Sequence, residues 1–257
     1  MLTRSSDGVE LYYEVTGDAE TAVVFVAGWL GNARWWDAQR DELAASHRVV
    51  ALDLAGHGKS GRDRETWTAQ AYADDIAAVV RAVAAPRVIL VGHSMSGAFS
   101  VLAAPQLAGL AGIILVDTLK NLEGMPPMEQ VEAMFAKYRE DFAGTVRTIR
   151  APLLYGAKTP PELREHLDRE AIAAATGDEA VRLIEPFYQL DVRDAAKAVR
   201  VPVRGIDTDL HPHAPEINRK YFADYDHVTI PGYGHYPMIE APREFNAALR
   251  AQLLALA

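Results

Sequence analysis

One serine stands at an abrupt change of sequence pattern. Residues 87–104, RVILVGHSMSGAFSVLAA, run from a branched apolar stretch through Gly92, Ser94 and Ser96 into a stretch of small residues that is typical of a helix. Because Gly92 and Ser96 are small, the chain can turn sharply there and hold the Ser94 hydroxyl exposed in a strained conformation. The N–H groups at the start of a helix favour negative charge at that point. Ser94 is therefore a candidate nucleophile.

A serine hydroxyl needs a base, and the base needs a group that orients it. His235, in PGYGHYPMIEAP, follows the last predicted strand, and Asp117, in IILVDTLKN, ends the strand after the serine's own strand–helix unit. Loops that follow parallel strands lie at the same edge of a sheet, so the three side chains are expected to meet. The sequence predicts Ser94 as nucleophile, His235 as base and Asp117 as the acid that orients it.

Each candidate also has a structural alternative. In the structural alternative, Ser94 is a small residue tolerated at a tight turn and His235 is an ordinary loop histidine. Asp117 is then an N-cap of the following segment. His93 is expected to pack or to support the site rather than to act as the base. His211 and His213 have a spacing seen in metal sites, but no carboxylate cluster completes a ligand set, so no metal is predicted.

Alternating strand-like and helix-like stretches predict a mainly parallel sheet covered by helices. Between residues 121 and 196 no strong strand pattern appears, which indicates a helical insertion before the sheet resumes. Strands are predicted at residues 9–17, 22–28, 48–56, 87–92, 110–117, 201–207 and 227–232, and helices at 32–46, 71–86, 128–142, 160–176 and 241–257.

Composition narrows the functional classes. The chain has 257 residues, 49% hydrophobic and 24% charged, as in an ordinary globular protein. It contains no cysteine, which excludes disulfides and thiol catalysis, and its net charge of −9 argues against nucleic-acid or anionic-membrane partners. No apolar run has the length of a membrane helix and no secretion signal is evident. We expect a cytoplasmic protein with a small-molecule substrate, and the oligomeric state stays open.

The chain resembles the α/β-hydrolase superfamily over nearly its whole length. The stretches that carry the resemblance are VFVAGWLGNARWWDAQRDELA, VVALDLAGHGKSG, VGHSMSGA and VTIPGYGHYPMIEAPREF, in the family's order. The resemblance implies an α/β-hydrolase fold, with a mostly parallel eight-stranded sheet flanked by helices and a helical cap. The core domain is expected at residues 1–120 and 197–257, and the cap or lid at residues 121–196.

The resemblance also implies roles for single residues. The family's order of nucleophile, acid and histidine corresponds to Ser94, Asp117 and His235. Its oxyanion hole uses two backbone N–H groups, which correspond here to those of Met95 and Trp29. No cofactor is implied for this chemistry.

Three positions depart from the family's pattern. The usual His-Gly of the oxyanion loop is Ala27-Gly28 here, and Ser96 stands where glycine is common. Many members carry the acid after the penultimate strand, in the segment that reads GIDTDLHPHAP here, where the matching position holds His211. Asp117 is therefore the predicted acid. Asp209 is the alternative, and the neighbouring Asp207 is considered less favourable.

The main functional hypothesis is a serine hydrolase that cleaves a small carboxylic ester or related acyl compound through an acyl-enzyme on Ser94. One alternative is a cofactor-free dioxygenase, because such enzymes of this fold share Gly28-Trp29. They carry a substrate-binding histidine where this chain has Gly31. A carbon–carbon hydrolase or lyase and a non-catalytic ligand-binding receptor are further alternatives. Apolar residues of the insertion suggest an apolar substrate portion, namely Met125, Met128, Met134, Phe135, Tyr138, Phe187 and Tyr188.

Overall fold

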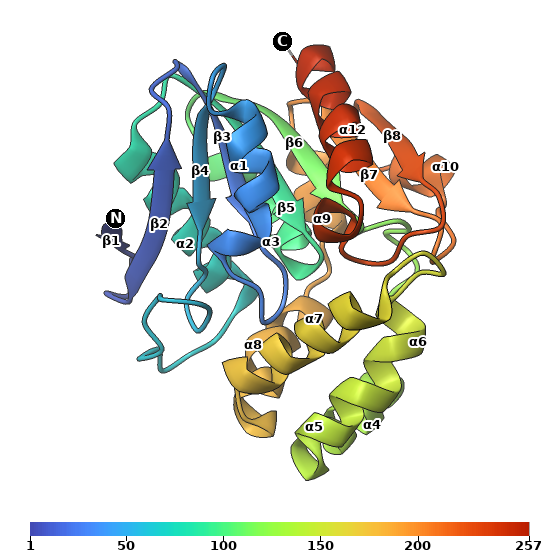
Figure 1. The fold of residues 1–257 in the computed structure, drawn as a ribbon. Coiled ribbons are helices and arrows are strands. Elements are labelled where there is room, and N and C mark those ends of the chain that lie inside the picture. Colours follow the sequence, from blue (N-terminus) through green and yellow to red (C-terminus); the bar gives the residue numbers. More distant parts are fainter. Residues whose placement is uncertain (257) are drawn as a thin grey trace.

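A single sheet of eight strands organises the protein in the computed structural model, which describes residues 1–256 (Figure 1). Its spatial order is β1-β2-β4-β3-β5-β6-β7-β8. Pairing is parallel from β4 across to β8 and antiparallel for β1–β2 and β2–β4. The strands are β1 (Leu2–Arg4), β2 (Glu10–Thr16), β3 (Thr21–Val26), β4 (Arg48–Leu52), β5 (Arg87–His93), β6 (Leu110–Val116), β7 (Val203–Thr208) and β8 (Tyr225–Ile230).

The predicted mostly parallel, eight-stranded sheet is confirmed. Seven strands overlap the stretches expected from their apolar patterns, and three of them, β2, β4 and β6, lie wholly within those stretches. Strand β1 has no such pattern, because its three residues lie at the sheet edge with both outer side chains exposed. Central strands such as β3 and β5 are buried almost throughout, as strands covered on both faces must be.

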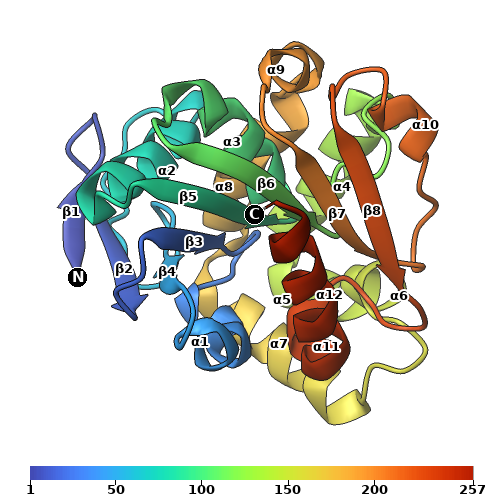
Figure 2. The same ribbon diagram turned by 90° about the horizontal axis from the view of Figure 1, so that it is seen from above.

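Helices cover both faces of the sheet, with α1 and α12 on one side and α2, α3 and α9 on the other (Figure 2). The helices outside the insertion, together with α9, are α1 (Asp37–Leu43), α2 (Ala69–Val83), α3 (Met95–Ala103), α9 (Arg193–Ala198), α10 (Pro215–Asn218), α11 (Pro237–Glu240) and α12 (Pro242–Ala255), with 3₁₀ turns η1 (Ala33–Trp36) and η2 (Ala104–Gln106). Two apolar clusters, one on each face, form the core.

Helix α2 shows how local chemistry sets an element's bounds. The Thr68 side chain accepts a hydrogen bond from the Ala71 N–H, which caps the first turn. The helix ends at Val83, where Ala84 takes a left-handed conformation with φ of 50°. Its buried face includes Tyr72 and Ile76, as the apolar spacing predicts.

The segment from the end of β6 to the start of β7 contains helices and no strand among its described residues 117–202. These helices are α4 (Met128–Glu140), α5 (Phe142–Thr145), the π-helical turn η3 (Val146–Arg150), α6 (Ala151–Leu154), α7 (Pro161–Ala174) and α8 (Gly177–Gln189), followed by α9. Helices α4 to α8 lie beyond the carboxyl ends of the strands (Figure 1). The division into a core and a cap at residues 121–196 remains a prediction.

Across residues 1–256, none of the helices combines the length and the apolar character needed to span a lipid bilayer.

Candidate active site

Ser94 occupies the corner between β5, which ends at His93, and α3, which begins at Met95. Its φ of 56° and ψ of −130° lie in a region that a residue with a side chain rarely adopts. The turn is tight enough that a Cβ at Gly92 would lie 2.7 Å from the Cα of Gly97. Glycine at 92 is therefore required for the close approach, and the strained corner predicted from the sequence is present.

Ser96 ties this corner to the neighbouring loop. Its Oγ lies 2.8 Å, 2.9 Å and 2.7 Å from the carbonyl oxygens of Val26, Ala27 and His93. A hydroxyl has one proton, so it donates to one of these acceptors at a time. The hydroxyl of Ser96 therefore links the end of β3 to the end of β5, which the glycine common at this position would not do.

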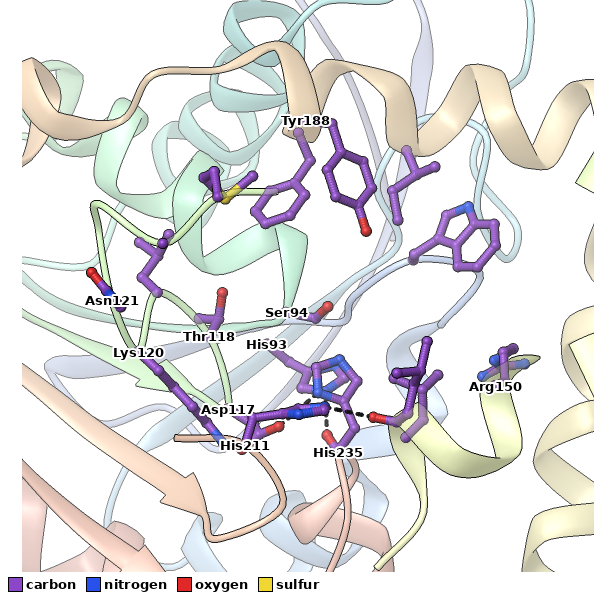
Figure 3. A pocket seen from close by; sticks show the side chains of 18 of the residues that line it. His93, Ser94, Asp117, Thr118, Lys120, Asn121, Arg150, Tyr188, His211 and His235 are labelled. Atoms are coloured by element: carbon purple, nitrogen blue, oxygen red, sulfur yellow. Dashed lines mark hydrogen bonds and ion pairs between the residues drawn. The ribbon is translucent and has the colours of Figure 1, made fainter. Parts of the chain in front are cut away.

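The predicted base and acid are in contact. Nδ1 of His235, which follows β8, lies 2.7 Å from Oδ2 of Asp117, which follows β6 (Figure 3). The carboxylate can only accept, so the hydrogen-bond network assigns the proton to Nδ1. Nε2 of the imidazole is then left with a lone pair that can take a proton. Asp117 itself has a positive φ of 46°.

The carboxylate of Asp117 is buried and fully hydrogen-bonded. Its Oδ1 accepts from the Thr208 backbone N–H at 2.9 Å and from the Thr208 hydroxyl at 3.0 Å. The ammonium of Lys120 lies 2.6 Å from the same oxygen. Burial alone would raise the pKa of Asp117, but the hydrogen bonds and charges of His235 and Lys120 outweigh it and hold that pKa well below its usual range.

The backbone of His235 is held on both sides. Its N–H donates to the Leu154 carbonyl oxygen at 2.7 Å, and its own carbonyl oxygen accepts from Nε2 of His93 at 2.7 Å. Burial, together with the nearby His235, lowers the pKa of His93 to about 3, so this ring is neutral at pH 7. His93 thus supports the histidine loop, in line with the supporting role that the sequence indicates.

The two expected oxyanion donors flank Ser94. Met95 is the first residue of α3, and Trp29 lies in the loop after β3. A Cβ on Gly28 would lie 2.7 Å from Cβ of Ser94, so the glycine lets this loop approach the serine closely. Neither backbone N–H, of Trp29 or of Met95, has an acceptor among residues 1–256. Their role as an oxyanion hole remains a prediction.

A cavity of about 360 Å³ opens beside these groups, and Ser94 and His235 both line it (Figure 3). Ser94 is partly exposed to this cavity. Hydrogen bonds between catalytic groups often tighten only when substrate binds. The indole N–H of Trp29 donates to the Ala180 carbonyl oxygen of α8 at 2.7 Å, which joins the cavity wall to the insertion. The remaining wall is mainly apolar: Leu119, Leu122, Met125, Met134, Tyr138, Leu153, Leu154, Ile184, Phe187, Tyr188, Val192 and Tyr236.

Two of the apolar residues expected near a substrate lie elsewhere. Phe135 is completely buried in the core between helices, and Met128 is exposed at the start of α4. Some apolar residues on one face of an amphipathic helix line the cavity, and others pack in the protein interior. The helical spacing in the sequence is the same for both groups, so it does not show which residues reach the cavity.

The alternative acids Asp209 and Asp207 have other partners than His235. Asp209 is exposed and accepts from the Gly232 N–H at 2.6 Å. Asp207 faces His213, whose Nδ1 lies 3.0 Å from its Oδ2. His211, which holds the family's acid position by the sequence match, contacts the Leu153 carbonyl oxygen, and the residue of this segment that hydrogen-bonds to Asp117 is Thr208.

No group of three or more histidine, aspartate or glutamate side chains within residues 1–256 is arranged to hold a metal ion. His211 and His213 diverge, the first contacting the Leu153 carbonyl oxygen at 2.7 Å and the second contacting the Tyr225 hydroxyl at 2.9 Å.

Three residues near the site were not identified from the sequence. Thr208 directly follows a predicted strand, so its place at the sheet edge was a signal that it faces the site. Lys120 lies three residues after Asp117, a spacing that also allows an ion pair. Arg150, which lines the cavity, carries no local signal because a single arginine in a helical insertion is usually a surface residue.

Comparison with known proteins extends these observations. Residues 23–248 match the model of the alpha/beta hydrolase family. A bifunctional esterase/perhydrolase of Acinetobacter calcoaceticus is 29% identical over 92% of this chain and 94% of that protein. The lipase LipV of Mycobacterium tuberculosis is 29% identical over 95% of this chain and 98% of its own length.

Solved structures agree in fold. A malate-bound thermophilic esterase from Thermogutta terrifontis has a TM-score of 0.83 and 26% identity, covering 100% of this chain and 99% of that chain. An esterase from Exiguobacterium antarcticum has a TM-score of 0.87 at 18% identity, covering 98% of each chain, a likeness of fold alone. The family match spans the serine corner and the histidine loop together with most of the remaining chain, so this protein belongs to the α/β-hydrolase family.

Proposed function

We propose that this protein is a serine hydrolase that cleaves small carboxylic esters through an acyl-enzyme on Ser94. The observation that carries the proposal is the 2.7 Å contact between His235 and Asp117 at a cavity that the strained Ser94 also lines. Acyl transfer needs an oriented imidazole and a serine hydroxyl at one site, and here His235 and the partly exposed Ser94 line the same cavity.

In the proposed reaction, Nε2 of His235 takes the proton of Ser94 while Oγ attacks the ester carbonyl carbon. The N–H groups of Trp29 and Met95 stabilise the oxyanion, each worth about 3 kcal/mol in comparable sites. His235 then gives the proton to the leaving alcohol, which departs. Water attacks the acyl-enzyme with the same base, releasing the carboxylic acid and restoring Ser94. Asp117 stabilises the imidazolium that forms in both halves of the reaction.

The cavity and the relatives support an ester of limited size. A volume of about 360 Å³ suits a small molecule, and the wall is mainly apolar. Full-length relatives include proteins named as an esterase/perhydrolase and a lipase. Local packing disfavours the dioxygenase alternative, which needs a histidine at the position of Gly31. A Cβ at Gly31 would lie 2.6 Å from the Trp35 ring, so the site has no room for a histidine side chain.

A fluorophosphonate probe followed by peptide mapping tests the proposal directly. We expect the label on Ser94, together with turnover of a short p-nitrophenyl ester. Ser94→Ala should abolish labelling and lower kcat by about 10⁵-fold or more, as loss of a serine nucleophile does elsewhere. Ser46→Ala, which changes an exposed serine, is the matched control and should retain both.

The opposite results would assign a different function. Labelling of another residue, or esterase turnover that survives Ser94→Ala, would remove Ser94 from the mechanism. A folded protein that neither labels nor turns over any ester would favour the receptor or a different reaction of the fold.

A further inference from the structure

A buried guanidinium lies in the mainly apolar wall of the cavity. Arg150 ends the π-helical turn η3 of the insertion and is 2% exposed (Figure 3). One of its terminal nitrogens donates to the hydroxyl of Tyr236, the residue that follows His235. Arg150 is thereby held beside the histidine loop, on the same cavity that Ser94 lines.

The hydrogen-bonding capacity of Arg150 is largely unused. Its Nε and Nη1 atoms are buried and have no hydrogen-bond acceptor among residues 1–256. Asp168 is the one carboxylate of the described residues within 4 Å, at 3.8 Å from Nη1, which is too long for a hydrogen bond. Asp168 already accepts from the Tyr155 hydroxyl at 2.6 Å. A buried cation with open donors is costly, and arginine does not relieve the cost by losing its proton.

Basic side chains outnumber acidic ones in the cavity wall, the opposite of the excess of acidic side chains in the whole chain. The protein has 35 acidic and 26 basic side chains, yet the cavity wall contains two cations, Arg150 and Lys120, and a single acid, Asp117. That acid is already paired with His235 and Lys120. Arg150 is therefore the cation of this wall whose Nε and Nη1 donors have no acceptor within residues 1–256, and because both atoms are buried a ligand reaches them only when neighbouring side chains shift.

We propose that Arg150 binds a carboxylate of the substrate, so that the natural substrate is an ester carrying a free carboxylate besides its scissile bond. The planar guanidinium matches a carboxylate in charge and geometry, and adjacent donors can form two parallel hydrogen bonds with its oxygens. This proposal rests on the proposed serine hydrolase function. Hydrolysis with water would release a dicarboxylate and an alcohol when the charge lies on the acyl portion, or a carboxylic acid and a hydroxy acid when it lies on the alcohol portion.

The test compares esters that differ only in charge. Monoethyl glutarate is paired with ethyl 4-carbamoylbutanoate, its carboxamide isostere, and 4-acetoxybutanoate is paired with 4-acetoxybutanamide. For at least one pair, we expect kcat/KM for the carboxylate to exceed that for the amide by about tenfold or more, as a charge-assisted bidentate contact allows. Arg150→Gln should bring this ratio close to one, and Arg150→Lys should retain part of it. Arg147→Gln, an exposed change on the same turn, should keep the wild-type ratio.

A binding measurement separates this proposal from the hydrolase function. Free glutarate should raise the melting temperature of the wild-type protein and bind in calorimetry, whereas glutaramide should do neither. This experiment needs neither turnover nor a folded Arg150 variant. Binding of glutarate but not of glutaramide by a wild-type protein that turns over no ester would retain the anion site and reject the hydrolase. Ester turnover with equal kcat/KM for the charged and neutral members of both pairs would reject the carboxylate site and retain the hydrolase.

Discussion

Two aspartate–histidine pairs lie at neighbouring strand ends of this sheet, and they differ in almost every other respect. Asp117 follows β6 and contacts His235, while Asp207 lies in β7 and faces His213. Both carboxylates are 1% exposed, so burial alone does not distinguish them. The first pair lines the cavity with Ser94, and the second does not reach it.

The difference lies in the donors that surround each carboxylate. Asp117 accepts from the Thr208 backbone and hydroxyl and pairs with Lys120, whereas the oxygens of Asp207 have no aligned hydrogen-bond donor within residues 1–256. Burial therefore raises the pKa of Asp207, only partly opposed by His213. An acid that must stabilise an imidazolium has to remain ionised, and the environment of Asp117 alone provides for that.

The largest expected contrast between the pairs is in turnover. Asp117→Asn should lower kcat for a p-nitrophenyl ester by about 10⁴-fold, because an amide no longer stabilises the imidazolium or fixes the Nδ1 proton. Asp207→Asn should change kcat by less than about threefold, since neither Asp207 nor its partner His213 lines the cavity. Steady-state kinetics of the two variants measures the contrast, and comparable losses in both would make Asp207 part of the site.

The contributions of the two carboxylates to the free energy of unfolding should change in opposite directions with pH. The folded pKa of Asp117 lies below its ordinary value of 3.8, so its contribution is present above that pH and is lost as the pH falls. Asp117→Asn should therefore cost about 3 kcal/mol at neutral pH, with a smaller cost in acid.

The folded pKa of Asp207 is raised, so the protonated form is favoured by the fold and this contribution is lost as the pH rises above 3.8. Asp207→Asn should accordingly become more favourable relative to wild type from low to neutral pH. Urea unfolding from about pH 3 to about pH 8 measures both differences. Curves that move in the same direction for the two variants would contradict the assigned environments.

Most of the fold was predictable because its signals are local. Continuous apolar runs marked the central strands, and a single apolar face marked α2. Strand β1 was missed since its three residues have no buried side to produce a pattern. Helix α8 was also not identified, although its N-terminus carries a capping box between Thr176 and Glu179.

The candidate site was predictable to the extent that topology determines it. Chain order and the common edge of parallel strands were enough to bring His235 and Asp117 together. The position of Thr208 after a predicted strand places it at the sheet edge, but its hydrogen bonds to Asp117 depend on the register between β6 and β7, which only the folded sheet shows. Arg150 was missed for a similar reason, since only the packed insertion places it against Tyr236.

Lys120 offers an intermediate test of why the two carboxylates differ. Lys120→Met keeps much of the side chain's length but removes the ammonium 2.6 Å from Asp117 Oδ1. The unfolding free energy should fall by about 2 kcal/mol at neutral pH, the usual worth of a hydrogen bond to a charged group. The pKa of Asp117 should rise, so acid unfolding should begin at higher pH than in the wild type. Exposed Lys197→Met, in contrast, should leave the acid midpoint unchanged.

Thr208→Val is the finest probe, because it removes one hydroxyl and keeps the shape of the side chain. The backbone N–H of residue 208 still donates to Asp117, so only the 3.0 Å contact from Oγ1 is lost. We expect a destabilisation of about 1 kcal/mol and a fall in kcat of severalfold. Thr229→Val on β8 makes the same change at an exposed position and, as the control, should have little effect. Thr208→Val kinetics indistinguishable from wild type would mean that the backbone N–H and Lys120 alone separate Asp117 from its neighbour Asp207.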